Sequence, residues 1–502
     1  MTVTLFENGR VLSPGGTFEE ASIVVSGGRI ESVVPAGEAL PPDSGPELDR
    51  VDLAGIYVVP GFVDCHIHLT ALALNKLRCD LSAASSARDV CEKMSLWAAS
   101  HPDAPFLMGV DFDESRWENG QLPTKLMLDG IDDRRPVLVR RICGHVGVVN
   151  SALLKRVRLR PDLVDQEAGV IREHVLWEAG HLWEPDDGEV MASIEAAIRD
   201  LHRLGVTTIH DLVEPERFET YVRGVAASRA PLRIDAMIHT NPRDLEYYRR
   251  TVAESGARDF RVIGAKCFLD GSLGARTAAL NSDYADGPGW GTLLMRREVV
   301  RALAEECFED GYVLAIHAIG DRAVDLAAKS LRDFPKETNL FRIEHCEIAG
   351  PAQIENLRWA PAVLSLQPNF VRNWGGAGGL YERRLGRERV RWSNRYRTFL
   401  SAGLSCIFGS DGMPPGPLYG IKGATEHPTL EERLTPGEAL SCCTSRPHAV
   451  GAHTREAGTL EAGRLADFVL LDASPLTEDL DRVKVLGTII DGESVYDAEA
   501  DR

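Results

Sequence analysis

The feature that most constrains the fold of this chain is a long middle region in which apolar, strand-like segments alternate with amphipathic helical segments. Such alternation is typical of a parallel α/β fold. The first candidate strand covers residues 58–67. Nine more begin near Pro105, Pro136, Thr207, Leu232, Val262, Tyr312, Phe341, Ala362 and Ser405. These ten candidates are two more than a closed (β/α)8 barrel requires.

Two of the candidates, at 105–113 and 136–150, lie in a stretch of about 71–205 that is rich in tryptophan. The tryptophans of this stretch are Trp97, Trp117, Trp177 and Trp183. We predict that it is an insertion, in which these rings form either a small core or a hydrophobic lid. The remaining eight strands predict an α/β fold over residues 58–458, a (β/α)8 TIM-like barrel with an inserted α/β subdomain.

Both ends of the chain have a different sequence pattern, because they consist of short strand-like segments separated by turn signals. Examples are 22–30 near the N-terminus and 466–471 and 487–496 near the C-terminus. Neither end has enough strands to bury a face alone. We therefore predict one small β-sandwich built from both termini, with residues 1–57 and 459–502 as its two parts.

Composition excludes several classes of protein. The 502 residues are 44% hydrophobic and 26% charged, as in ordinary globular proteins. No apolar run reaches the roughly 20 residues of a membrane span, and the N-terminus does not resemble a signal peptide. The net charge is −19 and basic residues are scattered, which argues against nucleic-acid binding. Ten cysteines without a C-x-x-C pair favour reduced thiols and a cytoplasmic protein.

The first barrel strand carries a group of polar side chains that could bind a metal ion. Asp64, His66 and His68 alternate along it, so their side chains are expected on one face. Two imidazoles with a carboxylate behind them can hold one ion from a rigid edge. A pair of histidines at this spacing is also compatible with a structural role, so the prediction depends on what else the chain supplies.

Further polar residues fall at the carboxyl ends of other predicted strands, where barrel enzymes carry their chemistry. Lys266 lies on strand 4, His317 ends strand 5, His345 ends strand 6 and Asp411 ends strand 8. Taken singly, each has a structural explanation, such as a hydrogen-bonded core histidine or a helix cap. Together with His66 and His68, they would converge on one barrel mouth.

The chain resembles the amidohydrolase superfamily, and within it the branch of large metal-dependent hydrolases that includes N-substituted formamide deformylases. The resemblance covers nearly the whole chain. It rests on motifs at 60–69, 144–151, 270–280, 317–323, 342–345, 409–411 and 463–471.

This resemblance implies a set of metal ligands. His66 and His68 would bind one ion and His317 and His345 a second, while Lys266, carboxylated to a carbamate, would bridge them. Asp411 would bind metal and act as the general base. Zinc is the expected metal because imidazole and carboxylate ligands suit it, with Mn, Fe and Co as alternatives. A single ion in place of two is a further alternative.

Other residues are candidates for shaping the substrate pocket. The resemblance suggests that His145 contacts substrate, with structural burial as the alternative. Asp270, Ser272 and Arg276 lie in a glycine-containing loop after strand 4, which is well placed to line the pocket. His210 and His239 are expected to end strands 2 and 3, as supporting or structural residues.

The predicted function is hydrolysis of a C–N bond, of amide or formamide type, by metal-activated water. Two alternatives keep the metal site, a heterocycle deaminase and a lactonase, and a third is a barrel without chemistry that serves as a binding module. The expected partner is a small-molecule substrate, with neither nucleic acid nor membrane. A homodimer is one assembly that the sequence allows.

Overall fold

Eight parallel strands form a nearly closed barrel in the computed structural model, which describes residues 3–39 and 48–500. Residues 1, 2 and 40–47 of the predicted N-terminal part, with 501 and 502, lie outside the described residues. The barrel strands, in sheet order, are β6 (Phe62–Ile67), β13 (Val206–Val213), β14 (Arg233–Ile238), β15 (Phe260–Phe268), β16 (Val313–Ala318), β17 (Phe341–His345), β18 (Ala362–Leu366) and β19 (Cys406–Phe408). The predicted barrel is therefore confirmed, with each strand beginning within a few residues of its expected start.

Backbone hydrogen bonds connect the segment after β19 back to β6. The amide of Asp411 donates to the carbonyl oxygen of His66 over 2.6 Å. Gly409 makes this approach possible, because a Cβ at this position would lie 2.2 Å from the backbone nitrogen of His66. Residue 409 must therefore be glycine for β19 to bring Asp411 beside the first strand.

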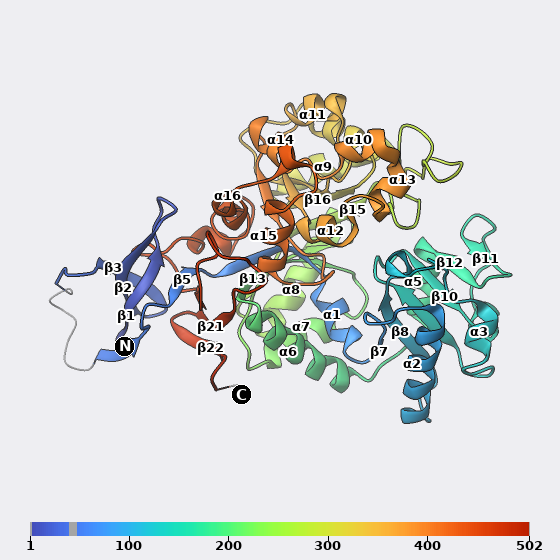
Figure 1. Ribbon diagram of the computed structural model, residues 1–502, viewed down its shortest axis with the longest axis horizontal. Coiled ribbons are helices and arrows are strands. Elements are labelled where there is room, and N and C mark those ends of the chain that lie inside the picture. Colours follow the sequence, from blue (N-terminus) through green and yellow to red (C-terminus); the bar gives the residue numbers. More distant parts are fainter. Residues whose placement is uncertain (1–2, 40–47, 501–502) are drawn as a thin grey trace.

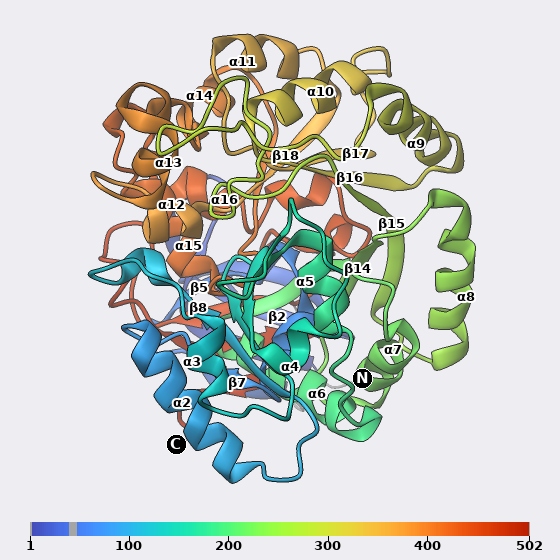
Figure 2. The same cartoon turned by 90° about the vertical axis from the view of Figure 1, so that its right-hand side faces the viewer.

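Helices surround the barrel strands (Figures 1 and 2). They are α1 (Leu69–Asn75), α6 (Asp187–Arg203), α7 (Phe218–Ala227), α8 (Leu245–Ser255), α9 (Arg297–Asp310), α10 (Asp321–Leu331), α11 (Pro351–Leu357), α12 (Pro368–Trp374), α13 (Leu380–Arg389), α14 (Tyr396–Ser401), α15 (Pro417–Thr425) and α16 (Pro436–Ser441). Short 3-10 helices occur at η2 (Pro242–Asp244), η3 (Val390–Trp392), η4 (Leu430–Glu432), η5 (Arg446–Ala449) and η6 (Thr454–Glu456).

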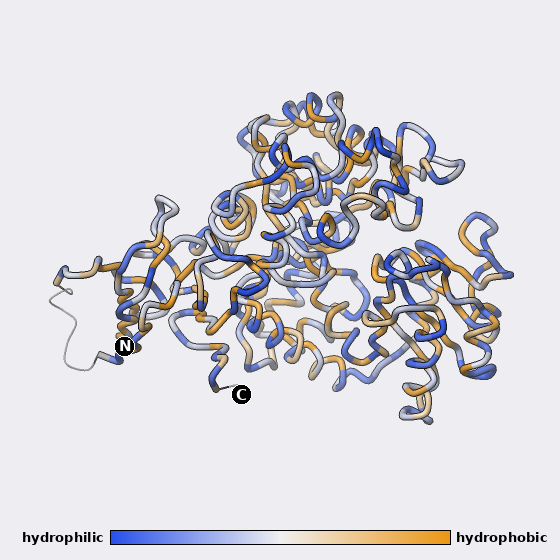
Figure 3. The backbone as a smooth tube through the Cα atoms, in the orientation of Figure 1, coloured by the Kyte–Doolittle hydropathy of each residue, from blue (hydrophilic) through white to orange (hydrophobic). Residues whose placement is uncertain are grey.

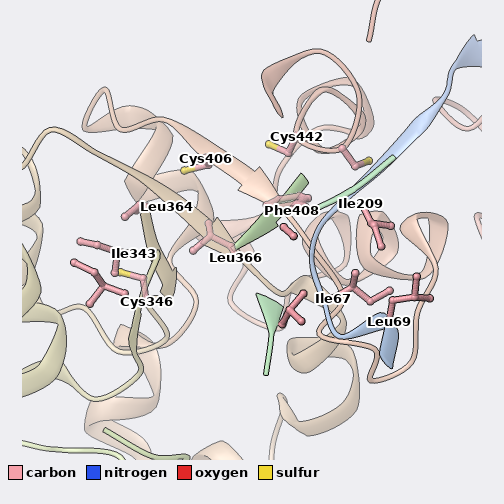
Figure 4. Close-up of a cluster of buried hydrophobic side chains, with 14 of the residues drawn as sticks. Ile67, Leu69, Ile209, Ile343, Cys346, Leu364, Leu366, Cys406, Phe408 and Cys442 are labelled. Carbon is pink, nitrogen blue, oxygen red and sulfur yellow. The ribbon is translucent and has the colours of Figure 1, made fainter. Parts of the chain in front are cut away.

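The core between strands and helices comes from the periodicity of both. In α10, for example, Ala323, Val324, Ala327 and Leu331 are buried on one face. Strand residues such as Ile67, Ile209 and Phe408 pack in the same cluster, part of which is shown in Figure 4. Burial of this apolar surface stabilises the barrel and holds the strand ends rigid.

The insertion forms a separate six-stranded sheet with its own helices. In sheet order, its strands are β11 (Val164–Asp165), β12 (Val170–Arg172), β10 (Val146–Val149), β9 (Val137–Arg141), β8 (Leu107–Phe112) and β7 (Cys79–Asp80). Its helices are α2 (Ala87–Ser100), η1 (Glu114–Arg116), α3 (Lys125–Asp129), α4 (Ser151–Leu154) and α5 (Glu173–Gly180). In Figure 2 this subdomain, coloured blue to cyan, lies in front of the barrel.

One helix inside the range expected for the insertion packs on the barrel. Helix α6 buries Val190, Ile194, Ala197 and Leu201 in the barrel's main core cluster. Its apolar stripe contacts α1 and α7, the helices beside the first two barrel strands. The sheet of the insertion itself spans residues 79–172.

Both termini contribute to a third sheet, of eight strands. The strands are β1 (Val3–Leu12), β2 (Phe18–Ser26), β3 (Arg29–Pro35), β4 (Leu48–Asp52), β5 (Tyr57–Pro60), β20 (Phe468–Leu471), β21 (Val485–Ile490) and β22 (Glu493–Asp497). The strands expected to form a β-sandwich from both termini belong to one hydrogen-bonded sheet, because β5 pairs with both β1 and β20. Phe6 and Phe468 meet edge to face in its core, with ring centroids 5.0 Å apart.

Hydrophobic and hydrophilic stretches alternate along the chain in all three parts of the molecule (Figure 3). No helix in residues 3–39 and 48–500 is both long and apolar enough to cross a membrane.

Candidate metal centre

The six predicted metal ligands surround one cavity at the carboxyl ends of the barrel strands. The cavity has a volume of about 680 Å³, and the insertion lines it together with the barrel. The predicted ligands in its wall are His66, His68, Lys266, His317, His345 and Asp411. They come from strands β6, β15, β16 and β17, from the position just after β6, which is His68, and from the segment after β19. The parallel barrel therefore collects residues that are up to 345 positions apart in the chain.

His66 and His68 both direct a ring nitrogen at Asp411. Nε2 of His68 lies 3.1 Å from Oδ1 of Asp411, and Nε2 of His66 lies 3.6 Å from the same oxygen. One nitrogen or oxygen each from His66, His345 and Asp411 lie within 4.8 Å of one another. This spacing allows the three residues to bind a common ion.

The opposite ring nitrogens of the two histidines are held by acceptors. Nδ1 of His66 lies 2.6 Å from Oε2 of Glu344, and Nδ1 of His68 lies 2.6 Å from the carbonyl oxygen of Leu212. Acceptors at Nδ1 place the proton there, which leaves the lone pair of each Nε2 available for a metal ion.

Glu344 is part of a buried network inside the barrel. Arg342 is fully buried and donates to Oε1 of Glu344 over 2.8 Å and to the carbonyl oxygen of Cys65 over 2.6 Å. A third contact joins Arg342 to Nδ1 of His210 over 2.9 Å. Arg342 and His66 together hold the pKa of Glu344 well below its ordinary value, although burial alone would raise it. Glu344 is therefore ionised beneath His66.

His317 and His345 complete the cluster of imidazoles, with ring centroids 4.5 Å apart. Nε2 of His317 lies 3.2 Å from the carbonyl oxygen of Gly271, whereas Nδ1 of His345 is buried without a hydrogen-bond partner. Burial lowers the pKa of both rings well below its ordinary value, so both are neutral.

Two of the predicted ligands have strained backbone conformations. His345 and Asp411 have φ angles of 69° and 54°, in the left-handed region that non-glycine residues seldom adopt. Such strain persists where surrounding structure imposes it, and it is common at functional sites.

Lys266 is 2% exposed, and its Nζ has no hydrogen-bond partner. The nitrogen lies 5.1 Å from the ring centroid of Phe268. Burial lowers the pKa of Lys266, with no carboxylate close enough to form a salt bridge in the described residues. An amine in this environment is more readily neutral than a surface lysine, and only a neutral amine can react with carbon dioxide.

Asp411 remains acidic despite its location. Burial alone would raise its pKa, but the adjacent imidazoles of His66 and His68 lower it below its ordinary value of 3.8. The carboxylate is therefore ionised at neutral pH and can accept a proton.

His145 reaches the same cavity from the insertion, between β9 and β10. Nδ1 of its ring lies 2.8 Å from Oε2 of Glu173, the first residue of α5. Although burial opposes it, the charge of Glu173 raises the pKa of His145 to about 9. His145 is therefore an imidazolium at neutral pH, and its ring centroid lies 6.2 Å from that of His317.

Of the three predicted pocket residues in the loop after strand β15, only Ser272 lines a cavity. Ser272 lines a small adjoining cavity together with His317 and Asp411. Asp270 is buried and accepts from the amides of Ile319 and Gly320, so it organises the loop around His317. Arg276 lies outside both cavities, because its guanidinium donates to the carbonyl oxygen of Pro288 over 2.9 Å.

Three further residues of the strands act as supports. Asp64 is buried and accepts from the amide of Ser410 over 2.8 Å, so it holds the Asp411 segment, and it is not among the residues that line the cavity. His210 lies in the barrel interior against Arg342, within β13 and not at its end. His239 follows β14, at the cavity wall, with Nδ1 2.8 Å from Glu214.

The tryptophans of the insertion have both of the expected roles. Trp97 and Trp117 belong to the core of the insertion, whereas Trp177 and Trp183 line the cavity.

Sequence reasoning did not identify Glu344, Arg342 or Glu173 as parts of the site. A signal was present for the first two. Arg342 and Glu344 occupy alternate positions of a buried strand, so both charged side chains lie on the same face, where each needs a partner. No local pattern marks Glu173, which reaches His145 through tertiary folding.

A parallel barrel with imidazole, amine and carboxylate side chains gathered at the carboxyl ends of its strands is typical of an enzyme. The chain belongs to the amidohydrolase family, whose model matches residues 49–496. It is a hydrolytic enzyme that acts on C–N bonds.

Known proteins resemble the chain over most of its length. A putative amidohydrolase, YtcJ, of Bacillus subtilis (strain 168) is 29% identical over 497 residues, which cover 90% of this chain and 91% of the relative. An N-substituted formamide deformylase of Arthrobacter pascens is 25% identical, covering 95% of each chain. An uncharacterized metal-dependent hydrolase from Pyrococcus furiosus has a similar solved structure, with a TM-score of 0.74, 28% identity, and coverage of 95% of this chain and 100% of that one.

Proposed function

We propose that this protein is a metal-dependent hydrolase of amide-type C–N bonds, formamides included, with zinc as the metal. One observation carries the proposal: Nε2 of His66 and Nε2 of His68 converge on Oδ1 of Asp411, while acceptors hold both Nδ1 atoms. The resemblance to a formamide deformylase and to a metal-dependent hydrolase supports the reaction class.

The residues present fit one or two divalent ions. Two unpaired buried nitrogens, Nζ of Lys266 and Nδ1 of His345, have no other partner in the described structure. A buried polar atom without a partner is costly, so binding a metal ion would remove that cost at His345. Carboxylation would convert Lys266 into an anion that can bridge two ions. His66, His68 and Asp411 would hold one ion, and His317 and His345 the other.

When bound, zinc polarises a carbonyl oxygen and lowers the pKa of water. Asp411, ionised and adjacent to both histidines, takes the proton from the attacking water. It then passes the proton to the leaving nitrogen, so that an amine departs and a carboxylic acid remains.

His145 is placed to stabilise charge on the substrate. Its ring is cationic, and Glu173 holds Nδ1, so Nε2–H is free to donate. An imidazolium at this position would hydrogen-bond the acyl oxygen as negative charge develops on it.

The proposal is tested by a product screen of the purified protein, with metal content measured on the same sample. Amides and formamides should yield an amine and an acid. Release of ammonia from a heterocycle, or of a hydroxy acid from a lactone, would contradict the proposal that the enzyme cleaves an amide-type C–N bond.

A double variant, His66→Ala with His68→Ala, should lose most of one equivalent of metal together with the activity. An exposed histidine, His101, supplies the control His101→Ala, which should change neither. Unchanged metal content in the double variant would overturn the assignment of these ligands.

We also propose that the protein acts in the cytoplasm on a small molecule. All ten cysteines are free, and eight of them are buried, which suits a reducing compartment. A homodimer stays a prediction from the sequence.

A further inference from the structure

A second polar group lines the same cavity, at the junction of the barrel with the insertion. It consists of Asn75 at the end of α1, Arg78, Asp111 on β8, Arg140 on β9 and Trp183. None of these residues belongs to the proposed metal centre.

Two guanidinium groups converge on a single neutral acceptor in this group. Nη1 of Arg78 and Nη2 of Arg140 each donate to Oδ1 of Asn75 over 3.0 Å. The Nε atoms of both arginines are buried and have no hydrogen-bond partner. Like charges held this close repel each other, so the arrangement favours a bound anion.

The negative charge nearby is smaller than the positive charge. Asp111 is the carboxylate closest to Arg140, with its Oδ1 4.0 Å from Nη2, and its Oδ2 accepts from Asn75. Arg78 is 8% exposed and has no carboxylate within 4.0 Å in the part of the chain that the structure describes. Burial and the charge of Arg140 lower the pKa of Arg78 well below its ordinary value. One carboxylate thus faces two buried cations.

The surroundings hold Arg78 in place without neutralising it. Its Cζ lies 4.4 Å from the ring centroid of Trp183, a cation–π contact that does not consume its N–H groups. The acidic residues Glu184, Glu214 and Glu216 also line the cavity, but all three are exposed, and water screens their charge.

The group lies at a definite distance from the proposed metal centre. Helix α1 begins directly after His68 and ends at Asn75. At a rise of 1.5 Å per residue, its seven residues separate the two sites by about 10 Å. A small extended molecule can span this distance within the cavity.

We propose that Arg78 and Arg140 form a subsite for a carboxylate of the substrate, and that the enzyme acts on amides bearing a carboxylate at the end remote from the scissile C–N bond. Planar guanidinium groups match a carboxylate with two parallel hydrogen bonds. The proposal rests on the proposed function for its reaction and on the second polar group for its specificity.

The test compares a homologous series of N-formyl-ω-aminoalkanoates with the corresponding uncharged carboxamides. Wild-type kcat/KM should be at least about tenfold higher for the carboxylates, because a hydrogen bond between charged groups contributes on this scale. The preference should peak at one chain length, near the spacing of the two sites. Arg78→Gln and Arg140→Gln should each lower kcat/KM for the carboxylate by about tenfold and leave that for the carboxamide unchanged.

Arg88→Gln, a charge change on the exposed side of α2, is the matched control and should leave both values unchanged. Unfolding temperature and metal content identify any variant that does not fold. Equal kcat/KM for carboxylate and carboxamide, or a ratio that neither Gln variant alters, would overturn the subsite.

If neither series is hydrolysed, that result counts against the proposed function. Binding measurements then decide whether the subsite exists. In that case calorimetry with the same uncleaved acid and carboxamide should show tighter binding of the acid to the wild type, lost in Arg78→Gln. Equal binding of the two compounds would overturn the subsite independently of catalysis.

Discussion

Oε2 of Glu344 lies 2.6 Å from Nδ1 of His66, while Nε2 of the same ring lies 3.6 Å from Oδ1 of Asp411. One imidazole thus connects a buried carboxylate inside the barrel with a carboxylate in the cavity. Arg342 fixes the inner carboxylate in turn, through donation to Oε1 over 2.8 Å. The orientation of His66 therefore depends on residues that never reach the substrate.

Replacement of Glu344 should weaken metal binding without removing a ligand. In Glu344→Gln the anionic acceptor at Nδ1 is lost and Arg342 keeps an unpaired buried charge. We expect metal affinity to fall about 10- to 100-fold and the free energy of unfolding to fall by roughly 3 kcal/mol. Chelator competition and denaturant unfolding measure the two effects. Glu388→Gln, at an exposed residue, is the control, and unaltered metal affinity in Glu344→Gln would contradict the role.

Asp411→Asn keeps the shape of the side chain but removes the proton acceptor. We expect kcat to fall by at least about 100-fold, with most of the metal retained and the fold intact. Because the pKa of Asp411 is lowered from its ordinary value of 3.8, the carboxylate is ionised above that value. Wild-type activity that depends on it should be lost only as the pH falls through the lowered pKa. A variant with near wild-type turnover at full metal loading would show that another group moves the proton.

Lys266 should be carboxylated when two ions are bound. Enrichment with ¹³C-bicarbonate should give a carbamate carbon resonance in the wild type that is absent from Lys266→Ala. The variant should lose the second ion and its activity, and a short carboxylate in the buffer should restore part of each. Lys329→Ala, at a surface lysine, is the control. Two bound ions without a carbamate signal would refute the proposal.

His145→Ala should affect substrate more than metal. The imidazolium lines the cavity from the insertion and is not among the proposed ligands. We expect kcat/KM to fall by about 100-fold, mainly through kcat, because the imidazolium stabilises charge that develops on the acyl oxygen, with metal content unchanged. Kinetics across a panel of amides, with metal analysis, measures both. Equal activity on every substrate would make His145 a structural residue.

The ion pair between His145 and Glu173 should make stability depend on pH. The pKa of His145 in the folded state, about 9, is above its ordinary value of 6.5. The contribution of the ion pair to the free energy of unfolding is therefore complete below pH 6.5 and is lost as pH rises through about 9. The difference in free energy of unfolding between wild type and Glu173→Gln should shrink across this interval. Glu178→Gln, on the exposed side of α5, should show no such change, and a constant difference for Glu173→Gln would contradict the pair.

Much of the fold could be predicted because its signals are local. The alternation of strand and helix patterns located the barrel strands, and strand ends indicated Lys266, His317 and Asp411 as neighbours. Carboxyl ends of parallel strands meet at one rim, so residue order and strand period suffice to bring these side chains to one cavity. Family resemblance, in turn, supplied the roles proposed for them.

Other features required contacts that no local pattern encodes. Helix α6 lies within the sequence range of the insertion, yet its apolar stripe packs on the barrel. Arg276 lies in the same loop after strand β15 as Ser272, but the loop turns its guanidinium towards Pro288. In each case the deciding partner is distant in sequence or lies on an irregular loop, where periodicity carries no information.

The sequence by itself determined which side chains stand at the strand ends, because strand period and chain order are properties of neighbouring residues. Only the tertiary structure decided which of them touch. The pairing of Glu344 with His66 joins residues 278 positions apart across the barrel. The approach of Arg78 and Arg140 to Asn75 depends on how the insertion packs against α1. Such contacts depend on sheet register and on the packing of separate elements, which arise only when the whole chain has folded.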